Sequence, residues 1–136
     1  MPNHFHLLIK QKSIDGISKL LKHLINAYTA YFNLRHKRTG SLLQGRFKAV
    51  QILTEELLLH VSRYIHLNPL SSELIKNLSA YPWSSYSEYF GNSNGVCSKE
   101  IILSQFLTLK EFEKFTLDQA DYAKELNRIK HLVMEN

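Results

Sequence analysis

The chain has 136 residues and a net charge of +5, with 44% hydrophobic and 21% charged residues, a composition typical of one soluble globular domain. Its apolar runs are far shorter than the roughly 20 residues of a membrane span, and its first residues do not resemble a secretory signal. A single cysteine, Cys97, excludes an internal disulfide, and we expect a bacterial cytoplasmic location.

Basic residues concentrate in the first half of the chain. Residues 1–50 carry nine lysines and arginines and one acid, Asp15, whereas the remaining residues carry eight bases and eleven acids. Such a polarised charge indicates contact with a polyanion. A solvated basic face without a partner is the alternative interpretation.

Residues 4–10 alternate in a way that predicts a β-strand. In a strand His4 and His6 share one face, while Phe5 and Leu7 share the other. Two imidazoles on one rigid surface begin a divalent-metal site. The pair alone is a weak signal, because two ligands rarely hold a metal.

Apolar residues recur at helical spacing from Ile17 to Leu34, and a basic tail follows at residues 35–38. Positive charge suits the carboxyl end of a helix, and Gly40 then marks a stop. Residues 41–53 predict a second strand, in which Gly45 marks a bulge or a close backbone approach.

Thr54, followed by two glutamates, predicts the start of a helix that runs to Asn68, before Pro69. A folded loop over residues 81–95 follows, with Trp83 as its buried anchor. The further helices that we expect cover residues 73–78, 99–107, 109–115 and 117–133, with capping boxes that begin at Thr108 and Thr116.

Two strands are too few for an independently stable sheet. We therefore expect that partner strands come from a second chain, as in a homodimer, or that an N-terminal piece is missing.

Tyr64 and Asn68 lie four residues apart in the helix predicted over residues 54–68, so they share one face. Packed over His4 and His6, they would complete a site with two imidazoles, an amide oxygen and a phenol. Mg²⁺ or Mn²⁺ suits such oxygen ligands and the phosphate it would bridge. The phenol would attack a phosphodiester and form a covalent phosphotyrosine.

Other interpretations of these residues stay open. A tyrosine that borders apolar helix positions is commonly a core residue, and His60 and His66 are more simply surface or core side chains than ligands. Tyr28 and Tyr31 are competing nucleophiles, although their spacing favours a core position.

Five stretches in this order, MPNHFHLLI, NAYTAYFNLRHKRTG, SLLQGRFKA, YIHLNPL and YPWSSY, resemble the REP-associated tyrosine transposases. These are single-tyrosine HUH transposases related to insertion-sequence transposases. His4-Phe5-His6 matches the HUH motif of this family. Residues 40–48 match a second family motif, G-x-L-x-Q-G-R-F-K.

The resemblance implies an α+β ferredoxin-like fold that here lacks its N-terminal strand–helix–strand. Residues 1–96 would form the catalytic domain, and residues 97–136 a helical C-terminal extension. Tyr64 would be the nucleophile, and His4, His6 and Asn68 would hold Mg²⁺ or Mn²⁺. The substrate would be single-stranded DNA beside a palindromic hairpin. The side chains expected to contact DNA are Lys10, Lys12, Arg35, Lys37, Arg38, Gln44, Arg46 and Lys48.

Two other functions remain open at this point. A truncated or decayed transposase would bind hairpin DNA without chemistry, and an unrelated basic helical regulator would carry the motifs by chance. The sequence also leaves open whether Tyr64 acts with the histidines of its own chain or of a partner.

Overall fold

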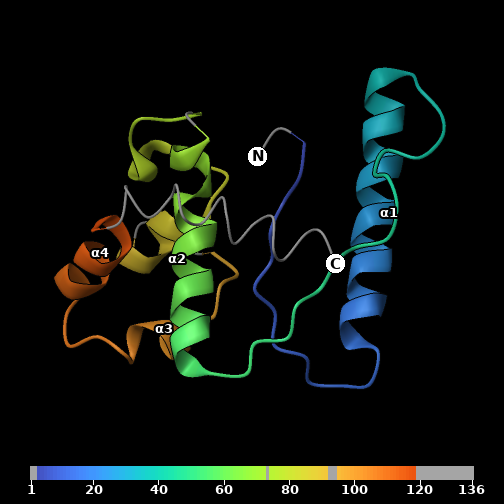
Figure 1. Cartoon of the computed structure of the whole chain (residues 1–136). Helices are drawn as coiled ribbons and strands as arrows, with labels where there is room; N and C mark the ends of the chain where they lie inside the picture. Colours follow the sequence, from blue (N-terminus) through green and yellow to red (C-terminus); the bar gives the residue numbers. More distant parts are fainter. Residues whose placement is uncertain (1–2, 73, 92–94, 119–136) are drawn as a thin grey trace. The chain divides into compact units, whose positions relative to one another are not determined.

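A computed structural model describes residues 3–72, 74–91 and 95–118, in which the regular elements are helices (Figure 1). The chain divides into two compact units. Unit 1 comprises Met1–Leu8 together with Val50–Asn136, and unit 2 comprises Ile9–Ala49. Within the described ranges, no helix has the length and apolar character needed to cross a membrane.

The predicted α+β ferredoxin-like fold is wrong for the described residues, because none of them lies in a β-strand. Residues 4–10 and 41–53, expected as strands, have no regular secondary structure. A strand is held by main-chain hydrogen bonds to a neighbour, and no ladder joins these segments to any described residue. Alternation of apolar and polar side chains was therefore not enough to predict a strand. It indicates which side of a segment is apolar, but it does not indicate whether another segment is available to pair with it.

Unit 2 is built around one long helix, α1 (Gly16–His36), which confirms the helix expected from the apolar spacing. The turn before it is closed by the amide of Gly16, which donates to the Ser13 carbonyl over 3.1 Å. Lys37, which follows the last helical residue, has a left-handed φ of 50° and caps the helix, and the Arg38 amide donates to the Asn33 carbonyl. The stop thus comes before Gly40.

Helix α2 (Glu55–Ser71) begins as expected, because Oγ1 of Thr54 accepts a hydrogen bond from the Leu57 amide over 3.1 Å. Its expected end before Pro69 is wrong. Proline has no amide to donate, yet the helix continues to Ser71, where Oγ donates to the Leu67 carbonyl. Residues 64 and 68 consequently lie within regular helix.

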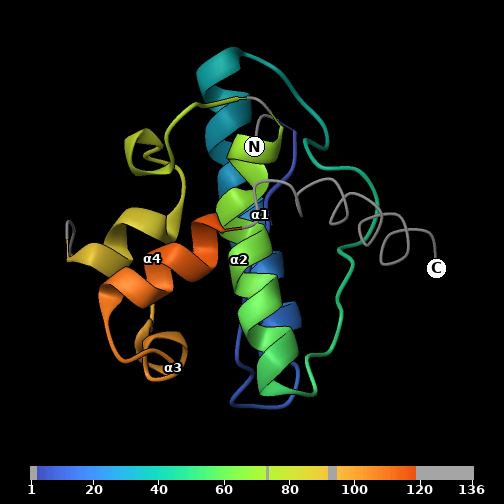
Figure 2. The ribbon, with the colours of Figure 1, turned by 60° about the vertical axis from the view of Figure 1, so that its left-hand side comes forward.

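The core of unit 1 forms where short helices pack on α2 (Figure 2). These are η1 (Leu78–Ala80), η2 (Ser85–Phe90), α3 (Glu100–Leu103) and α4 (Leu109–Leu117). Aromatic rings dominate the contact: Phe112 stacks on Tyr89 with 4.9 Å between ring centroids. The buried apolar residues of this core are Leu67, Leu78, Tyr86, Tyr89, Ile102 and Phe112.

The segment between α2 and α3 differs from its prediction. No helix forms over the described part of residues 73–78, and a single 3₁₀ turn begins only at Leu78. Trp83 is 82% exposed, so it does not anchor the following loop. Instead, Tyr86 and Tyr89 on the 3₁₀ helix η2 are buried, and they anchor this segment to the core.

The helices expected over residues 99–107 and 109–115 correspond to the shorter α3 and to α4. The capping box at Thr108 is confirmed, since its Oγ1 accepts from the Glu111 amide over 3.2 Å. Thr116 begins no helix, because it lies inside α4 and donates to the Phe112 carbonyl. Most of the helix expected over residues 117–133 falls outside the described residues.

Candidate functional site

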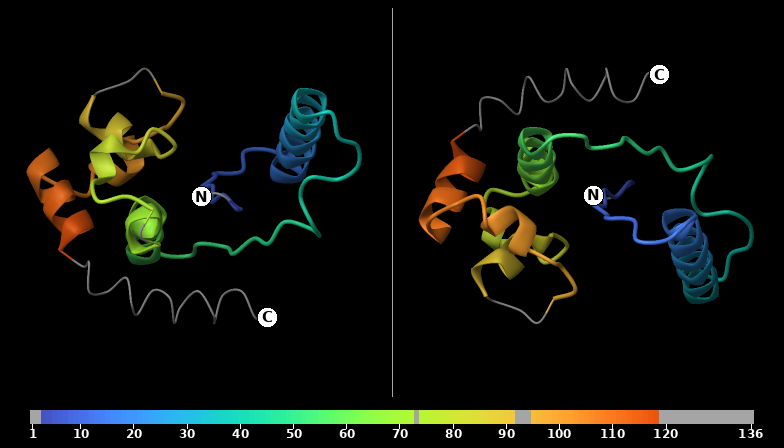
Figure 3. Two further views of the ribbon diagram at one scale, coloured as in Figure 1. Left: turned by 90° about the horizontal axis from the view of Figure 1, so that it is seen from above. Right: turned by 90° about the horizontal axis from the view of Figure 1, so that it is seen from below.

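Residues 3–8 run beside α2 within unit 1 (Figure 3). The rings of His6 and Tyr64 meet edge to face, with centroids 5.3 Å apart. The His4 ring is 5.1 Å from that of His6 in a similar arrangement. The juxtaposition of His4, His6 and Tyr64 expected from the sequence is therefore present, although the segment that carries the histidines is not a strand.

Tyr64 is half-buried on α2, and the environment of its phenol is set by two opposed effects. Loss of solvent raises the pKa of the Tyr64 phenol, and a hydrogen bond with the Asn68 side chain lowers it by a smaller amount. The net shift is upward, so the group is a neutral phenol at neutral pH. It would have to lose its proton while attacking an electrophile.

Asn68 is buried one helical turn after Tyr64. Its side chain favours the phenolate form of Tyr64, and its Oδ1 is a hydrogen-bond acceptor. That oxygen is shielded from solvent and accepts no hydrogen bond from the described residues. A buried acceptor of this kind costs about 1–3 kcal/mol, and a cation would satisfy it.

The two histidines also carry nitrogens of a type that binds a divalent cation. Nδ1 of His4 lies 2.7 Å from Oδ1 of Asn3, an atom that can only accept. Nδ1 of His4 therefore donates to this oxygen, which orients the ring. The Nε2 atoms of both His4 and His6 are shielded from solvent.

Two imidazoles and an amide oxygen fit Mn²⁺ well and Mg²⁺ acceptably. Within the described ranges, no three or more side chains of His, Cys, Asp and Glu gather where they could hold a metal ion. A metal at this site would therefore depend on Asn68 as its third protein ligand.

His60 and His66 take structural roles, in line with the simpler interpretation. Nδ1 of His60 accepts from Arg63 over 2.7 Å. His66 is buried, with Nε2 3.1 Å from Oγ of Ser85. Its ring packs edge to face on that of Tyr89, at 4.9 Å. Burial lowers the pKa of His66 to about 4, so it is neutral in the folded chain.

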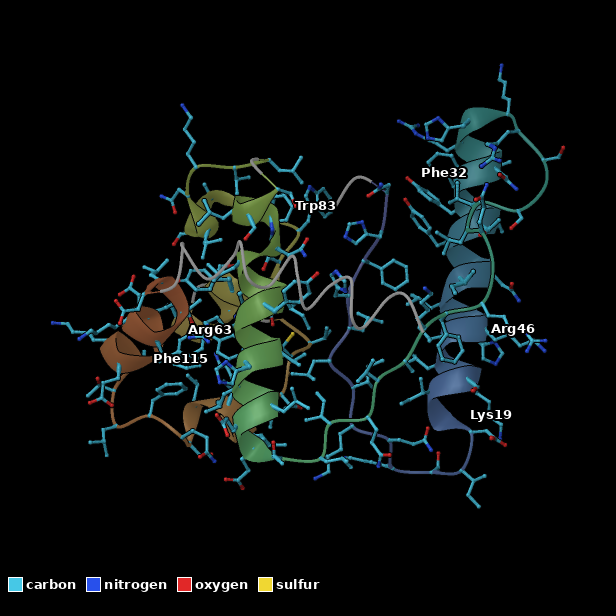
Figure 4. The ribbon with its side chains drawn as sticks, in the orientation of Figure 1. Lys19, Phe32, Arg46, Arg63, Trp83 and Phe115 are labelled. Carbon is cyan, nitrogen blue, oxygen red and sulfur yellow. The ribbon has the colours of Figure 1, made fainter. Side chains whose placement is uncertain are left out.

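Arg63 is the residue that sequence reasoning missed. It is buried on α2, and its guanidinium lies 4.3 Å from the centroid of the Phe115 ring on α4 (Figure 4). Nη1 also donates to the Phe115 carbonyl over 3.3 Å. An arginine one residue before Tyr64, between the apolar positions Val61 and Ile65, was the available signal. Arg63 joins α2 to α4 and thereby supports the helix that carries Tyr64.

The residues expected to contact DNA all have exposed side chains and all lie in unit 2. Tyr28 and Tyr31, expected in the core, belong to the same unit and are also exposed. The eight side chains are Lys10, Lys12, Arg35, Lys37, Arg38, Gln44, Arg46 and Lys48.

Comparison of the chain with protein-family models, with curated proteins and with solved structures finds no match. Interpretation of the site therefore depends on the residues themselves and on the motifs that they form.

Proposed function

We propose that the chain is a metal-dependent tyrosine transposase that cleaves and rejoins single-stranded DNA beside a hairpin. The observation that supports this most is the contact between the rings of His6 and Tyr64, with Asn68 hydrogen-bonded to the same phenol. These residues come from the stretches MPNHFHLLI and YIHLNPL, which are far apart in the sequence.

In the proposed step, Oη of Tyr64 attacks the phosphorus of a phosphodiester. A bond forms between phosphorus and the phenol oxygen, and the bond from phosphorus to the 3′ oxygen breaks. The phenol proton is transferred in the process to the departing 3′ oxygen. The products are a 5′-phosphotyrosine and a free 3′-hydroxyl, and the reverse step rejoins a strand without ATP because the ester bond is retained.

His4, His6 and Asn68 would hold the Mg²⁺ or Mn²⁺ ion. When bound, the ion would polarise the phosphodiester and offset the charge that develops on its oxygens. The Asn68 side chain also lowers the pKa of the phenol, which favours its phenolate form. Because the pKa of Tyr64 is raised, we expect the rate of adduct formation to increase with pH above neutrality.

The substrate and the setting follow from the same proposal. The basic unit 2 supplies positive charge for hairpin DNA, whose phosphates dominate affinity. His6 and Tyr64 of one chain are in contact, so the proposed chemistry does not require a homodimer. Action on chromosomal hairpins would place the protein at the bacterial nucleoid, in the cytoplasm.

The test is formation of a covalent adduct. The full chain is incubated with labelled single-stranded hairpin oligonucleotides and Mn²⁺, and denaturing gels detect labelled protein. We expect an adduct that Tyr64→Phe and EDTA abolish and that Asn68→Ala and His6→Ala reduce strongly. Tyr28→Phe and Tyr31→Phe, which alter the competing nucleophiles, should keep it. An adduct that persists in Tyr64→Phe would contradict the proposal.

A second function is favoured by one specific observation. The expected DNA-contacting side chains lie in unit 2, whereas Tyr64 lies in unit 1. A chain that only binds hairpin DNA would use the basic side chains of unit 2 and would not need Tyr64. Tight binding of the hairpin with no adduct under any metal condition would select this function.

A further inference from the structure

We infer that the second half of α1 and the turn after it form a stacking surface for the bases of single-stranded DNA. The stacking surface consists of Tyr28, Tyr31, Arg35, Lys37 and Arg38. The choice of DNA as the ligand rests on the proposed function; the stacking itself is argued from unit 2 alone.

The aromatic part of the stacking surface is accessible. Tyr28 is 51% exposed and Tyr31 is 63% exposed, although both are large and apolar enough to be buried. Residues three apart on a helix are neighbours, so the two rings lie on one side of α1. Each presents a π face, and every base can stack on such a face whatever its sequence.

The aromatic row continues towards the carboxyl end of α1. The Tyr28 ring lies 6.1 Å from the Phe32 ring, and the Phe32 ring lies 4.2 Å from that of His36 at an angle of 32°. Figure 4 places Phe32 near this end of the helix and Lys19 near the other. The rings therefore lie where the positive residues of the helix terminus begin.

The positive part is held in place by the turn after α1. The Asn33 side chain donates to the Gly40 carbonyl over 2.8 Å, which folds the turn back on the helix. Arg38 donates to the Ser41 carbonyl, and its guanidinium lies 5.8 Å from the Phe32 ring. Aromatic faces and guanidinium groups thus occupy one end of α1, the combination that binds a strand by stacking and by phosphate contacts.

Charge and ring exposure together select the ligand. Unit 2 carries all nine lysines and arginines of the first half of the chain and one acid, Asp15, so a polyanion is its natural partner. A DNA duplex keeps its base faces stacked inside the helix and offers nothing to the tyrosines. A single strand offers both phosphates and bases.

The experiment measures binding by fluorescence anisotropy in a Tyr64→Phe background, so that no covalent product contributes. Two labelled single strands of equal length are compared, one normal and one composed of abasic sites. For the normal strand we expect Tyr28→Leu with Tyr31→Leu to weaken binding at least about fivefold, because leucine keeps the apolar area and removes the π face. For the abasic strand the same variant should bind like the parent.

Matched variants separate stacking from general hydrophobic contact. Tyr28→Phe with Tyr31→Phe should bind the normal strand like the parent, because the rings remain. Leu20→Ala removes an exposed apolar side chain from the first half of α1 and should also leave binding unchanged. Circular dichroism checks that the leucine and alanine variants keep their helix content.

Three results would overturn the inference: equal affinity of the parent for normal and abasic strands, unchanged affinity in the leucine variant, or an equal loss in Leu20→Ala. Failure of the proposed function looks different. If binding depends on the two tyrosine rings but no Tyr64 adduct forms, only the proposed chemistry is contradicted. If an adduct forms but binding does not depend on the rings, only the stacking surface is contradicted.

Discussion

The two units of this chain differ in what they bury. Unit 1 has a core of aromatic and aliphatic side chains, and it also encloses Arg63 and His66. Unit 2 buries only Leu21 and exposes most of the apolar side of α1. Charge follows the same division, since the acids of the chain lie almost entirely outside unit 2. The comparison indicates that the free energy of folding comes mainly from unit 1, while unit 2 is suited to binding.

The largest expected effect comes from the core of unit 1. Phe112 is 1% exposed and its ring stacks on Tyr89, so Phe112→Ala should lower the free energy of unfolding by about 4 kcal/mol. The matched change in unit 2, Tyr31→Ala, should cost no more than about 0.5 kcal/mol, because that ring is mostly in water. Urea unfolding measures both. Equal losses of stability in the two variants would show that unit 1 does not contribute more to folding than unit 2.

A smaller effect is expected at the arginine that joins α2 to α4. Arg63→Met removes two hydrogen bonds and the contact with the Phe115 ring, and should cost about 3 kcal/mol. Arg46→Met, at an exposed arginine of unit 2, should leave stability unchanged in the same urea titration. A stable Arg63→Met protein would show that α4 is held without this side chain.

The pH dependence of stability tests the buried histidine. The folded pKa of His66 is about 4, below its ordinary value of 6.5, so between these values the unfolded chain binds the additional proton. Stability from this group is complete above pH 6.5 and falls as the pH drops towards 4. Between pH 7 and pH 5 we expect a loss of about 2 kcal/mol.

Variants assign that pH dependence to one histidine. His66→Gln should flatten the dependence between pH 7 and pH 5, whereas His36→Gln, on the exposed helix of unit 2, should leave it in place. Urea unfolding at the two pH values provides the measurement. The same slope in wild type and His66→Gln would place the titrating group elsewhere.

The smallest expected effect compares two helix starts. Thr108 caps α4 with its side chain, so Thr108→Ala should cost about 1 kcal/mol of stability. Asp15 precedes α1 with a left-handed φ of 58° and makes no side-chain capping bond. Asp15→Gly should therefore be neutral or slightly stabilising in thermal melts, because glycine favours that φ. A clear loss of stability in Asp15→Gly would mean that the Asp15 side chain stabilises α1 despite the absence of a capping hydrogen bond.

Sequence reasoning was most successful where the information is local. The starts of α2 and α4 were found because a threonine followed by an acid specifies its own hydrogen bond. It failed at Trp83 and Tyr31, which were expected to be buried and are exposed. Burial depends on what packs against a side chain, and neither spacing nor residue type specifies that neighbour.

Local sequence patterns are enough to specify the long helix α1, the capped helix α2 that carries Tyr64 and Asn68 on one face, and the separation of charge along the chain. These follow from propensity, spacing and composition, which act over a few residues. Long-range packing, in contrast, determines that residues 4–10 and 41–53 are not strands, that Arg63 is buried, and that the rings of His6 and Tyr64 are in contact. A strand and a contact between rings both need a second segment that is far away in the sequence. A pattern of neighbouring residues does not indicate whether pairing with such a segment is favourable.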